Sequence, residues 1–216
     1  GQALILVPTR ELALQVEEAL IDIGAAIGLK TEVVIGGAPA HKQIKGLARK
    51  PHVVIATPGR LIDHLQERHY SLELVHTIIL DEADRMFDIG FLPDIKRILK
   101  QAPTNRQTMM FSATMPPAIA QIASQFMKIP LRIEVSPAGT SAKNVKQEIF
   151  IVDKQAKVRL LEKILKDNNG SVLVFSRTKY GAKKINRFVQ AMGHTAAEIH
   201  SNKSLAQRKE ALAGFK

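Results

Sequence analysis

The stretch from Thr77 to Asp84 constrains the fold of this chain more than any other. Four β-branched or apolar residues, Thr77 to Leu80, run directly into the acidic tetrad Asp81-Glu82-Ala83-Asp84. A short apolar run without polar alternation predicts a strand that is buried on both faces of a parallel sheet. Ligands of such sheets bind outside the carboxyl ends of the strands, where paired carboxylates can hold a metal ion and orient a water. The stretch therefore indicates a nucleotide phosphate site, although an acidic cluster after a strand can also simply cap the next helix.

Composition narrows the class of protein. The chain has 216 residues, of which 45% are hydrophobic, so it can bury the core of one large domain or two small ones. It contains no cysteine, which excludes disulfides, thiol catalysis and cysteine-ligated metals and is typical of a reducing compartment. No apolar run approaches the roughly 20 residues of a membrane span. We therefore expect a soluble, cytoplasmic protein with no membrane partner.

Positive charge is concentrated in the second part of the chain. Residues 1–135 carry 15 Lys and Arg against 14 Asp and Glu, whereas residues 136–216 carry 16 against 6. A surface with this imbalance attracts polyanions through phosphate neutralisation and counterion release. A lysine-rich surface that only keeps the protein in solution would have the same composition.

Several predicted strands end in groups that suit phosphate. The strand at 3–7 leads into Pro8-Thr9-Arg10-Glu11, the strand at 32–35 into Gly36-Gly37, and the strand at 53–56 into Thr57-Pro58-Gly59-Arg60. Turn and cap chemistry explains each motif singly. Together they place small, basic and hydroxyl-bearing residues at one edge of a sheet, where helix-start amides and arginine can meet phosphate oxygens.

These stretches, with the tetrad and with Ser112-Ala113-Thr114 after a predicted strand at 108–111, resemble the DEAD-box ATP-dependent RNA helicases of superfamily 2. The resemblance spans almost all 216 residues, and Tyr180-Gly181-Ala182 is closest to the bacterial RhlE-type subgroup. It implies an RNA-stimulated ATPase that uses ATP and Mg²⁺ to unwind or remodel RNA locally. It also implies two doubly wound, RecA-like α/β domains, both incomplete here. We place the first at 1–135, a linker at 136–145 and the second at 146–216.

The resemblance also assigns roles to residues. Asp81 is expected to hold Mg²⁺ through water, and Glu82 to polarise the water that attacks the γ-phosphate. Asp84 is expected to reach Ser112 and Thr114, which couples the state of the nucleotide to the grip on RNA. The residues expected to contact the RNA backbone are Pro8, Thr9, Arg10, Glu11, Gly36, Gly37, Thr57, Pro58, Gly59, Arg60, Ser176, Arg177, Thr178, His200 and Arg208.

The second segment fits the family less closely. Further strands are predicted at 131–135, 147–152, 171–175 and 195–199. Ser201 stands where the family usually has glycine, and Leu205 where it usually has glutamine, while Gln207 is a conjectural substitute for that amide. We interpret the basic residues of the helix near 183–187 as a solvated face. Because aromatic residues are few, RNA recognition through the backbone is favoured over base stacking.

The sequence contains no Gly-x-x-x-x-Gly-Lys-[Ser/Thr] loop, which would cradle the β- and γ-phosphates. We therefore expect an internal fragment of a helicase that is inactive as an ATPase on its own. Two alternatives stay open for the parent protein: a hydrolysis-deficient RNA-binding or scaffold relative, and a DNA-directed helicase. RNA, as a single strand or short duplex, is the expected partner, with ribonucleoprotein or RNA-decay proteins as further expectations.

Overall fold

The computed structural model describes residues 2–134 and 145–215. The chain divides into two compact units, residues 1–141 and 142–216, and each is described here by itself. The linker predicted at 136–145 lies almost entirely outside the described residues, so its place and the two domain boundaries stay predictions. Among the described residues, no helix has the length and apolar character needed to cross a membrane.

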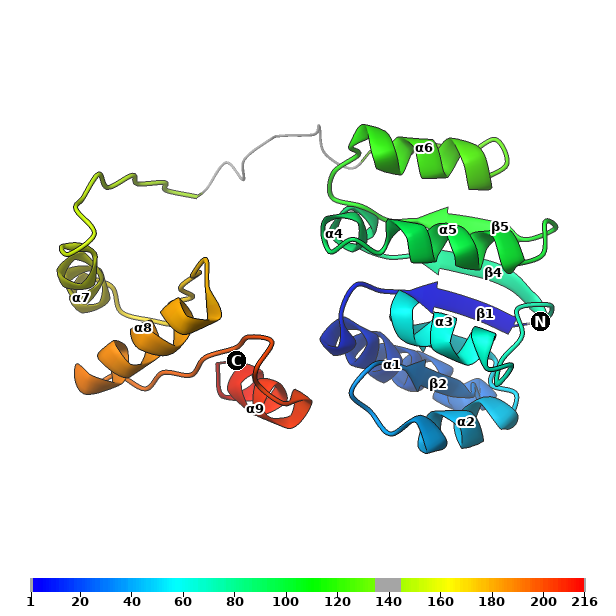
Figure 1. The fold of residues 1–216 in the computed structure, drawn as a ribbon, viewed down its shortest axis with the longest axis horizontal. Helices are drawn as coiled ribbons and strands as arrows, with labels where there is room; N and C mark the ends of the chain where they lie inside the picture. The colour runs from blue at the N-terminus through cyan, green and yellow to red at the C-terminus, as the bar shows by residue number, and fades with distance from the viewer. Residues whose placement is uncertain (1, 135–144, 216) are drawn as a thin grey trace. The chain divides into compact units, whose positions relative to one another are not determined.

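The first unit is built on a five-stranded parallel sheet with the order β2-β3-β1-β4-β5 (Figure 1). Each strand coincides, within a residue or two at either end, with one predicted from the sequence. This confirms the α/β class. The strands are β1 Gln2–Leu6, β2 Thr31–Val34, β3 Val53–Ala56, β4 Val75–Leu80 and β5 Gln107–Met110.

Helices cover the sheet on both faces. In Figure 1, α2, α3 and α5 lie in front of the strands and α1 behind them, as right-handed parallel crossovers require for this strand order. All four residues of β3 are buried, as are Ile78 and Leu80 of β4, so the core runs along the central strands. The helical elements are α1 Arg10–Gly24, η1 Ala25–Ile27, α2 Ala40–Ala48, α3 Pro58–Gln66, α4 Ala83–Asp88, α5 Leu92–Gln101 and α6 Pro117–Phe126.

The carboxyl ends of the five strands are aligned in one row. Leu6 of β1 pairs with the last residues of β3 and β4, and those strands pair in turn with the ends of β2 and β5. The ladder continues one residue further, because the amide of Asp81 donates to the Leu6 carbonyl at 2.9 Å. The residues that follow all five strands therefore share one edge of the sheet.

One strand predicted for the first unit is wrong. Residues 131–134 form no strand, and the side chains of Leu131 and Ile133 are exposed. The apolar sequence is suited to a strand, but the backbone must also find a neighbouring strand to complete its hydrogen bonds. The described sheet ends at β5, and this segment does not pair with that strand.

The described part of the second unit consists of helices joined by extended segments. The helices are α7 Lys157–Asp167, α8 Lys179–Ala191 and α9 Leu205–Phe215. The strands predicted at 147–152, 171–175 and 195–199 are absent from the described residues 145–215, and Ile151, for example, is 99% exposed. A helix closes its own hydrogen bonds, whereas a strand needs a partner, which explains why only the helices form here. The doubly wound sheet of the second domain stays a prediction.

Candidate functional site

The acidic tetrad begins at the carboxyl end of β4. Asp81 Oδ1 accepts the Glu82 amide at 3.0 Å, and Glu82 itself adopts left-handed backbone angles, φ 49° and ψ 52°. For a residue with a Cβ atom this conformation costs about 1–2 kcal/mol. The Glu82 carboxylate makes no capping bond to α4, so capping does not account for this residue. Lys50, Arg68 and Ile129 also have positive φ, so the strain at Glu82 is notable only together with its position after β4.

The Glu82 carboxylate is half-exposed and pairs with Arg85. Arg85 Nη1 lies 3.2 Å from Glu82 Oε2. The Arg85 side chain is 58% exposed and the Glu82 side chain 41% exposed, so water screens the ion pair and makes it weak. Among the described residues, no group of three or more His, Cys, Asp or Glu side chains gathers around a point that could hold a metal ion. Mg²⁺ commonly binds one or two carboxylates together with substrate phosphates. Asp81 and Glu82 therefore fit a magnesium–nucleotide complex better than a metal held by protein ligands alone.

Asp84 links α4 by hydrogen bonds to the loop that follows β5. Its Oδ2 accepts both the amide of Thr114, at 2.9 Å, and the hydroxyl of Thr114, at 2.7 Å. The Asp84 amide donates to Ser112 Oγ at 3.1 Å, and that hydroxyl donates to the Thr114 carbonyl at 2.7 Å. The predicted contact of Asp84 with Ser112 and Thr114 is thus present. Its role in coupling ATP to RNA stays a prediction.

These hydrogen bonds set the charge state of Asp84. Partial burial raises the pKa of its carboxyl, but the bonds from Thr114, Ser112 and the Arg85 amide outweigh burial and lower the pKa below its usual 3.8. Asp84 is therefore ionised at neutral pH and acts only as an acceptor. The link between α4 and the 112–114 loop is a charge-assisted one, which is stronger than a neutral hydrogen bond.

Arg10 lies over the glycine pair that follows β2. A Cβ atom at Gly37 would collide with the Arg10 guanidinium, and one at Gly36 would lie 3.2 Å from Arg10 Nη2. Gly37 also has a φ of 77°, which favours glycine. Thr9 has the local role expected of a cap, because its hydroxyl accepts the Leu12 amide at 3.2 Å. The structure thus brings the motif at 8–11 together with the glycine pair.

The motif after β3 opens α3. Thr57 is buried and its amide donates to the Val34 carbonyl, while Pro58 is the first residue of the helix. A Cβ atom at Gly59 would meet nothing within 4 Å, so packing within the chain does not require glycine there. Arg60 forms an ion pair with Asp63 at 3.7 Å. This motif lies at the same sheet edge as the acidic tetrad.

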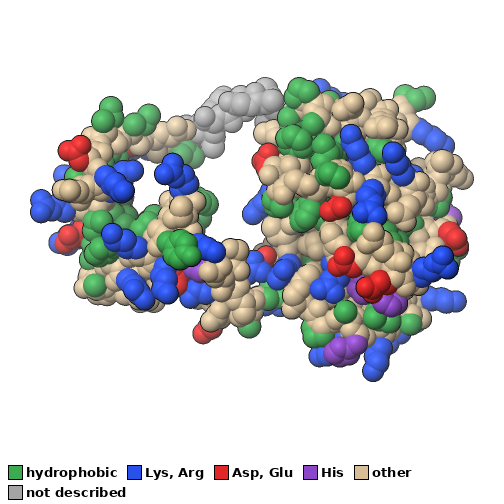
Figure 2. Space-filling model, viewed as in Figure 1, with side chains coloured by type: hydrophobic (Ala, Val, Ile, Leu, Met, Phe, Trp, Pro, Cys, Tyr) green, Lys and Arg blue, Asp and Glu red, His purple; other side chains and the backbone are tan. Residues whose placement is uncertain are grey.

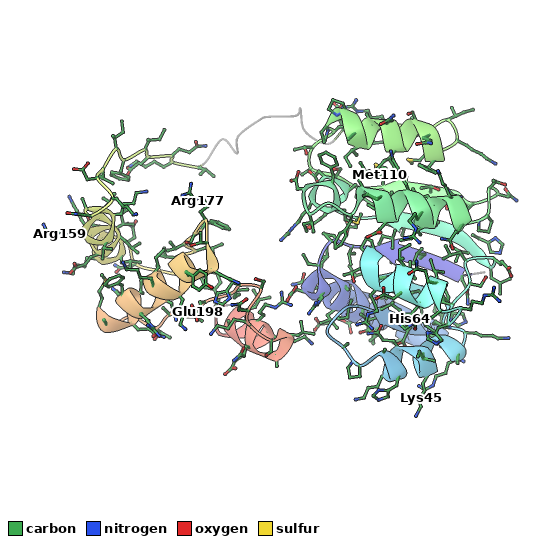
Figure 3. All side chains as sticks on the ribbon, viewed as in Figure 1. Lys45, His64, Met110, Arg159, Arg177 and Glu198 are labelled. Atoms are coloured by element: carbon green, nitrogen blue, oxygen red, sulfur yellow. The ribbon has the colours of Figure 1, made fainter. Side chains whose placement is uncertain are left out.

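The remaining predicted residues belong to the second unit. Thr178 caps α8 by accepting the Gly181 amide at 3.0 Å, and Ser176 donates to the Thr178 carbonyl at 3.2 Å. His200 Nδ1 accepts the Asn202 amide at 3.2 Å. Arg177, labelled in Figure 3, is exposed, and Arg208 lies in α9. The candidate RNA residues therefore form one set in each unit.

The conjecture that Gln207 replaces a missing amide is not favoured. The side-chain oxygen of Gln207 accepts the Ser204 backbone amide at 3.0 Å, and the backbone amide of Gln207 donates to Ser204 Oγ at 3.2 Å. This reciprocal pair is a capping box at the start of α9. The side-chain oxygen of Gln207 is thus engaged at the helix end.

Comparison with known proteins identifies the chain. Residues 1–122 match the DEAD/DEAH box helicase family. The chain belongs to this family. All 216 residues align at 40% identity with the DEAD-box ATP-dependent RNA helicase CshA of Geobacillus kaustophilus, covering 46% of that protein. The ATP-dependent RNA helicase CshA of Listeria monocytogenes is 38% identical, with 42% covered, and CshA of Bacillus subtilis is 37% identical, with 44% covered.

The matched relatives are longer than this chain, and their names bear on the subgroup. The chain spans about half the length of the curated relatives it matches. The relatives carry the name CshA, so they do not support the RhlE-type subgroup that the sequence suggested. Membership of the DEAD-box family is confirmed, whereas the subgroup is not.

The structure of this DEAD-box chain shows a buried polar bridge that sequence analysis missed. Gln43 Nε2 donates to the Ile35 carbonyl at 2.8 Å, and Gln43 Oε1 lies 3.0 Å from His64 Nε2. Gln43 is 3% exposed and His64, labelled in Figure 3, is 1% exposed. Ile35 directly precedes the glycine pair, and His64 lies in α3, which begins at Pro58. The bridge therefore links the residue before the glycine pair to the helix that the 57–60 motif opens.

His64 should make the stability of the first unit depend on pH. Burial is the main cause that lowers the pKa of His64 below 6.5, and the charge of nearby His69 is the second. The unfolded chain binds this proton more readily than the folded chain. The contribution of neutral His64 to stability is therefore fully present above pH 6.5, and it is lost as the pH falls from 6.5 towards the lower pKa of His64 in the folded protein. Urea unfolding at pH 7.5 and at pH 5.5 measures the free energy of unfolding. Between these two pH values the wild type should lose more of this free energy than His64→Gln. Equal losses in both proteins would contradict the prediction.

Proposed function

We propose that this chain is the part of an ATP-dependent RNA helicase that positions the attacking water and grips RNA. One observation carries the proposal. The aligned ends of five parallel strands bring the acidic tetrad, the 112–114 loop and three phosphate-suited motifs to one edge of the sheet. The names of the relatives supply ATP and RNA as the substrate and partner.

Asp81 and Glu82 are the proposed catalytic residues. Asp81 would hold Mg²⁺ together with the phosphates of ATP, and the ion would neutralise the charge that develops during hydrolysis. Glu82 would orient a water and accept its proton as the water oxygen attacks the γ-phosphorus, which releases ADP and phosphate. The half-exposed carboxylate of Glu82, which sits on a strained backbone and makes no capping bond to α4, supports this role.

The motifs that precede and follow the tetrad in the sequence would bind the sugar-phosphate backbone of the RNA. In the first unit these are the motif at 8–11 with Arg10, the glycine pair, and the motif at 57–60. In the second unit they are residues 176–178, His200 and Arg208. Asp84, through its hydrogen bonds with Ser112 and Thr114, would couple the state of the bound nucleotide to the binding of RNA. A single strand or short duplex is the proposed RNA form.

Finer assignments are also proposals. The domain boundaries at 135 and 146 follow the change in charge along the chain, and the RhlE-type subgroup rests on Tyr180-Gly181-Ala182 alone. Cytoplasmic location and ribonucleoprotein or RNA-decay partners rest on the family resemblance and composition.

RNA-stimulated ATP hydrolysis tests the proposal. The full-length product of the gene is expected to hydrolyse ATP faster with RNA than without it, and to separate a short RNA duplex. The 216-residue chain by itself is expected to show negligible hydrolysis, because it contains no loop that would hold the triphosphate. RNA binding without hydrolysis by the full-length protein would favour the scaffold alternative. Equal stimulation by DNA would favour a DNA-directed enzyme.

A further inference from the structure

Helix α8 carries an unusual concentration of positive charge. Its thirteen residues include Lys179, Lys183, Lys184 and Arg187 and no acidic residue. Helix α7 of the same unit is also basic, but there Lys166 pairs with Glu162 at 2.8 Å, as on an ordinary solvated helix face. In Figure 2, Lys and Arg side chains stand out over the part of the chain that contains both helices. The two helices therefore differ in how their charges are compensated.

Three of the α8 cations are not engaged in an ion pair in the described part of the chain. Lys183, Lys184 and Arg187 form no salt bridge within the described ranges 2–134 and 145–215. Glu198, whose carboxylate feels the charge of Lys183, is already bound to Lys203 at 2.8 Å and faces His200 at 3.6 Å. The charge of this helix face is thus available to an external anion.

The same helix face exposes two aromatic rings. Tyr180 is 73% exposed and Phe188 is 37% exposed, while Val189 on the opposite side of α8 is buried. Lys179 Nζ lies 5.5 Å from the centre of the Tyr180 ring, and Lys184 Nζ lies 5.6 Å from the centre of the Phe188 ring. Cation–π contact at these distances holds each ammonium beside a ring. Positive charge and a stacking surface are therefore provided together.

The rings and cations line one open groove of about 550 Å³, formed by Tyr180, Lys183, Lys184, Arg187, Phe188 and Ala191. Proteins that bind single-stranded nucleic acid combine a positively charged groove with exposed aromatic rings on which bases stack. A duplex keeps its bases stacked inside and cannot use such rings. The groove therefore matches a single strand better than a duplex.

We propose that the α8 groove is a second binding site for single-stranded nucleic acid, made of other residues than those assigned to the sheet edge and to the 176–178 motif. Lys183, Lys184 and Arg187 bind phosphates, and Tyr180 and Phe188 stack against bases. The site needs neither ATP nor hydrolysis, so it stands or fails independently of the proposed motor activity.

Salt dependence of binding tests the phosphate contacts. The full-length gene product is titrated without ATP with an oligouridine longer than the roughly 4–16 nucleotides that one such site covers. The double variant Lys184→Ala/Arg187→Ala is expected to bind about tenfold more weakly. Its slope of log affinity against log salt should fall by about 1.4, or about 0.7 for each lost contact. The matched variant Arg159→Ala/Lys163→Ala on α7 removes the same charge and should leave both quantities close to wild type.

Tyr180→Leu tests stacking. It should weaken oligouridine binding about tenfold while leaving the salt slope unchanged, because it removes a ring and no charge. Polyglutamate serves as a second polyanion and should compete poorly. The proposal is overturned if the α7 and α8 double variants behave alike, if Tyr180→Leu has no effect, or if polyglutamate binds as tightly as oligouridine, which would indicate an acidic protein partner instead.

Discussion

Replacing Glu82 with Gln is expected to lower RNA-stimulated ATP hydrolysis of the full-length gene product by about 10²–10⁴-fold, the usual contribution of a general base. The substitution keeps the size of the side chain and removes only its ability to accept a proton. The left-handed backbone at this position should persist, because it is set by the residues around Glu82 rather than by a capping bond of its carboxylate. Initial rates of phosphate release with saturating RNA measure the effect.

A matched control lies at the opposite end of β4. Glu73→Gln makes the same chemical change just before the amino end of β4, on an exposed side chain at the opposite edge of the sheet, and should leave hydrolysis unchanged. RNA affinity without ATP should also be unchanged in Glu82→Gln. If that variant retained more than about a tenth of the wild-type rate, Glu82 would not be the general base. The scaffold alternative would gain if neither wild type nor variant hydrolysed ATP.

Local pattern and parallel topology together made the first unit predictable. The run before Asp81 has no polar alternation, and β4 is indeed a central strand between β1 and β5. Once the strands are parallel, every motif that follows a strand must reach the same edge. The contact between Asp84 and Thr114, thirty residues apart, follows from that rule because β4 and β5 are neighbours.

The strand predictions that proved wrong share one physical cause. The segments at 131–134 and 147–152 carry strand-like sequences, but a strand exists only where a second strand accepts its hydrogen bonds. The partner is a property of the tertiary fold, which a local window does not contain. The bridge between Gln43 and His64 was missed for a related reason, since it joins α2 to α3. A signal was nonetheless present: Gln43 is one turn from buried Leu47, on the apolar side of its helix.

Replacing Gln43 with Met is expected to destabilise the first unit by about 2–4 kcal/mol. Methionine is similar in length but removes both hydrogen bonds, which leaves the Ile35 carbonyl and His64 Nε2 buried without their partner. Each unsatisfied buried group costs about 1–3 kcal/mol. Urea unfolding followed by circular dichroism measures the loss. Gln101→Met, an exposed residue at the end of α5, should change stability by less than about 0.5 kcal/mol.

The same variant separates a packing role from a positioning role. Because Gln43 holds the residue before the glycine pair, its loss should weaken RNA binding by the full-length protein even where the protein is fully folded. Adding His64→Leu replaces the second partner with an apolar group, so the double variant should lose less stability than the two single losses combined. Additive losses would show that Gln43 and His64 act independently, and unchanged RNA affinity would restrict the bridge to stabilising the fold. A double variant that recovers stability but not RNA affinity would assign the bridge to loop positioning.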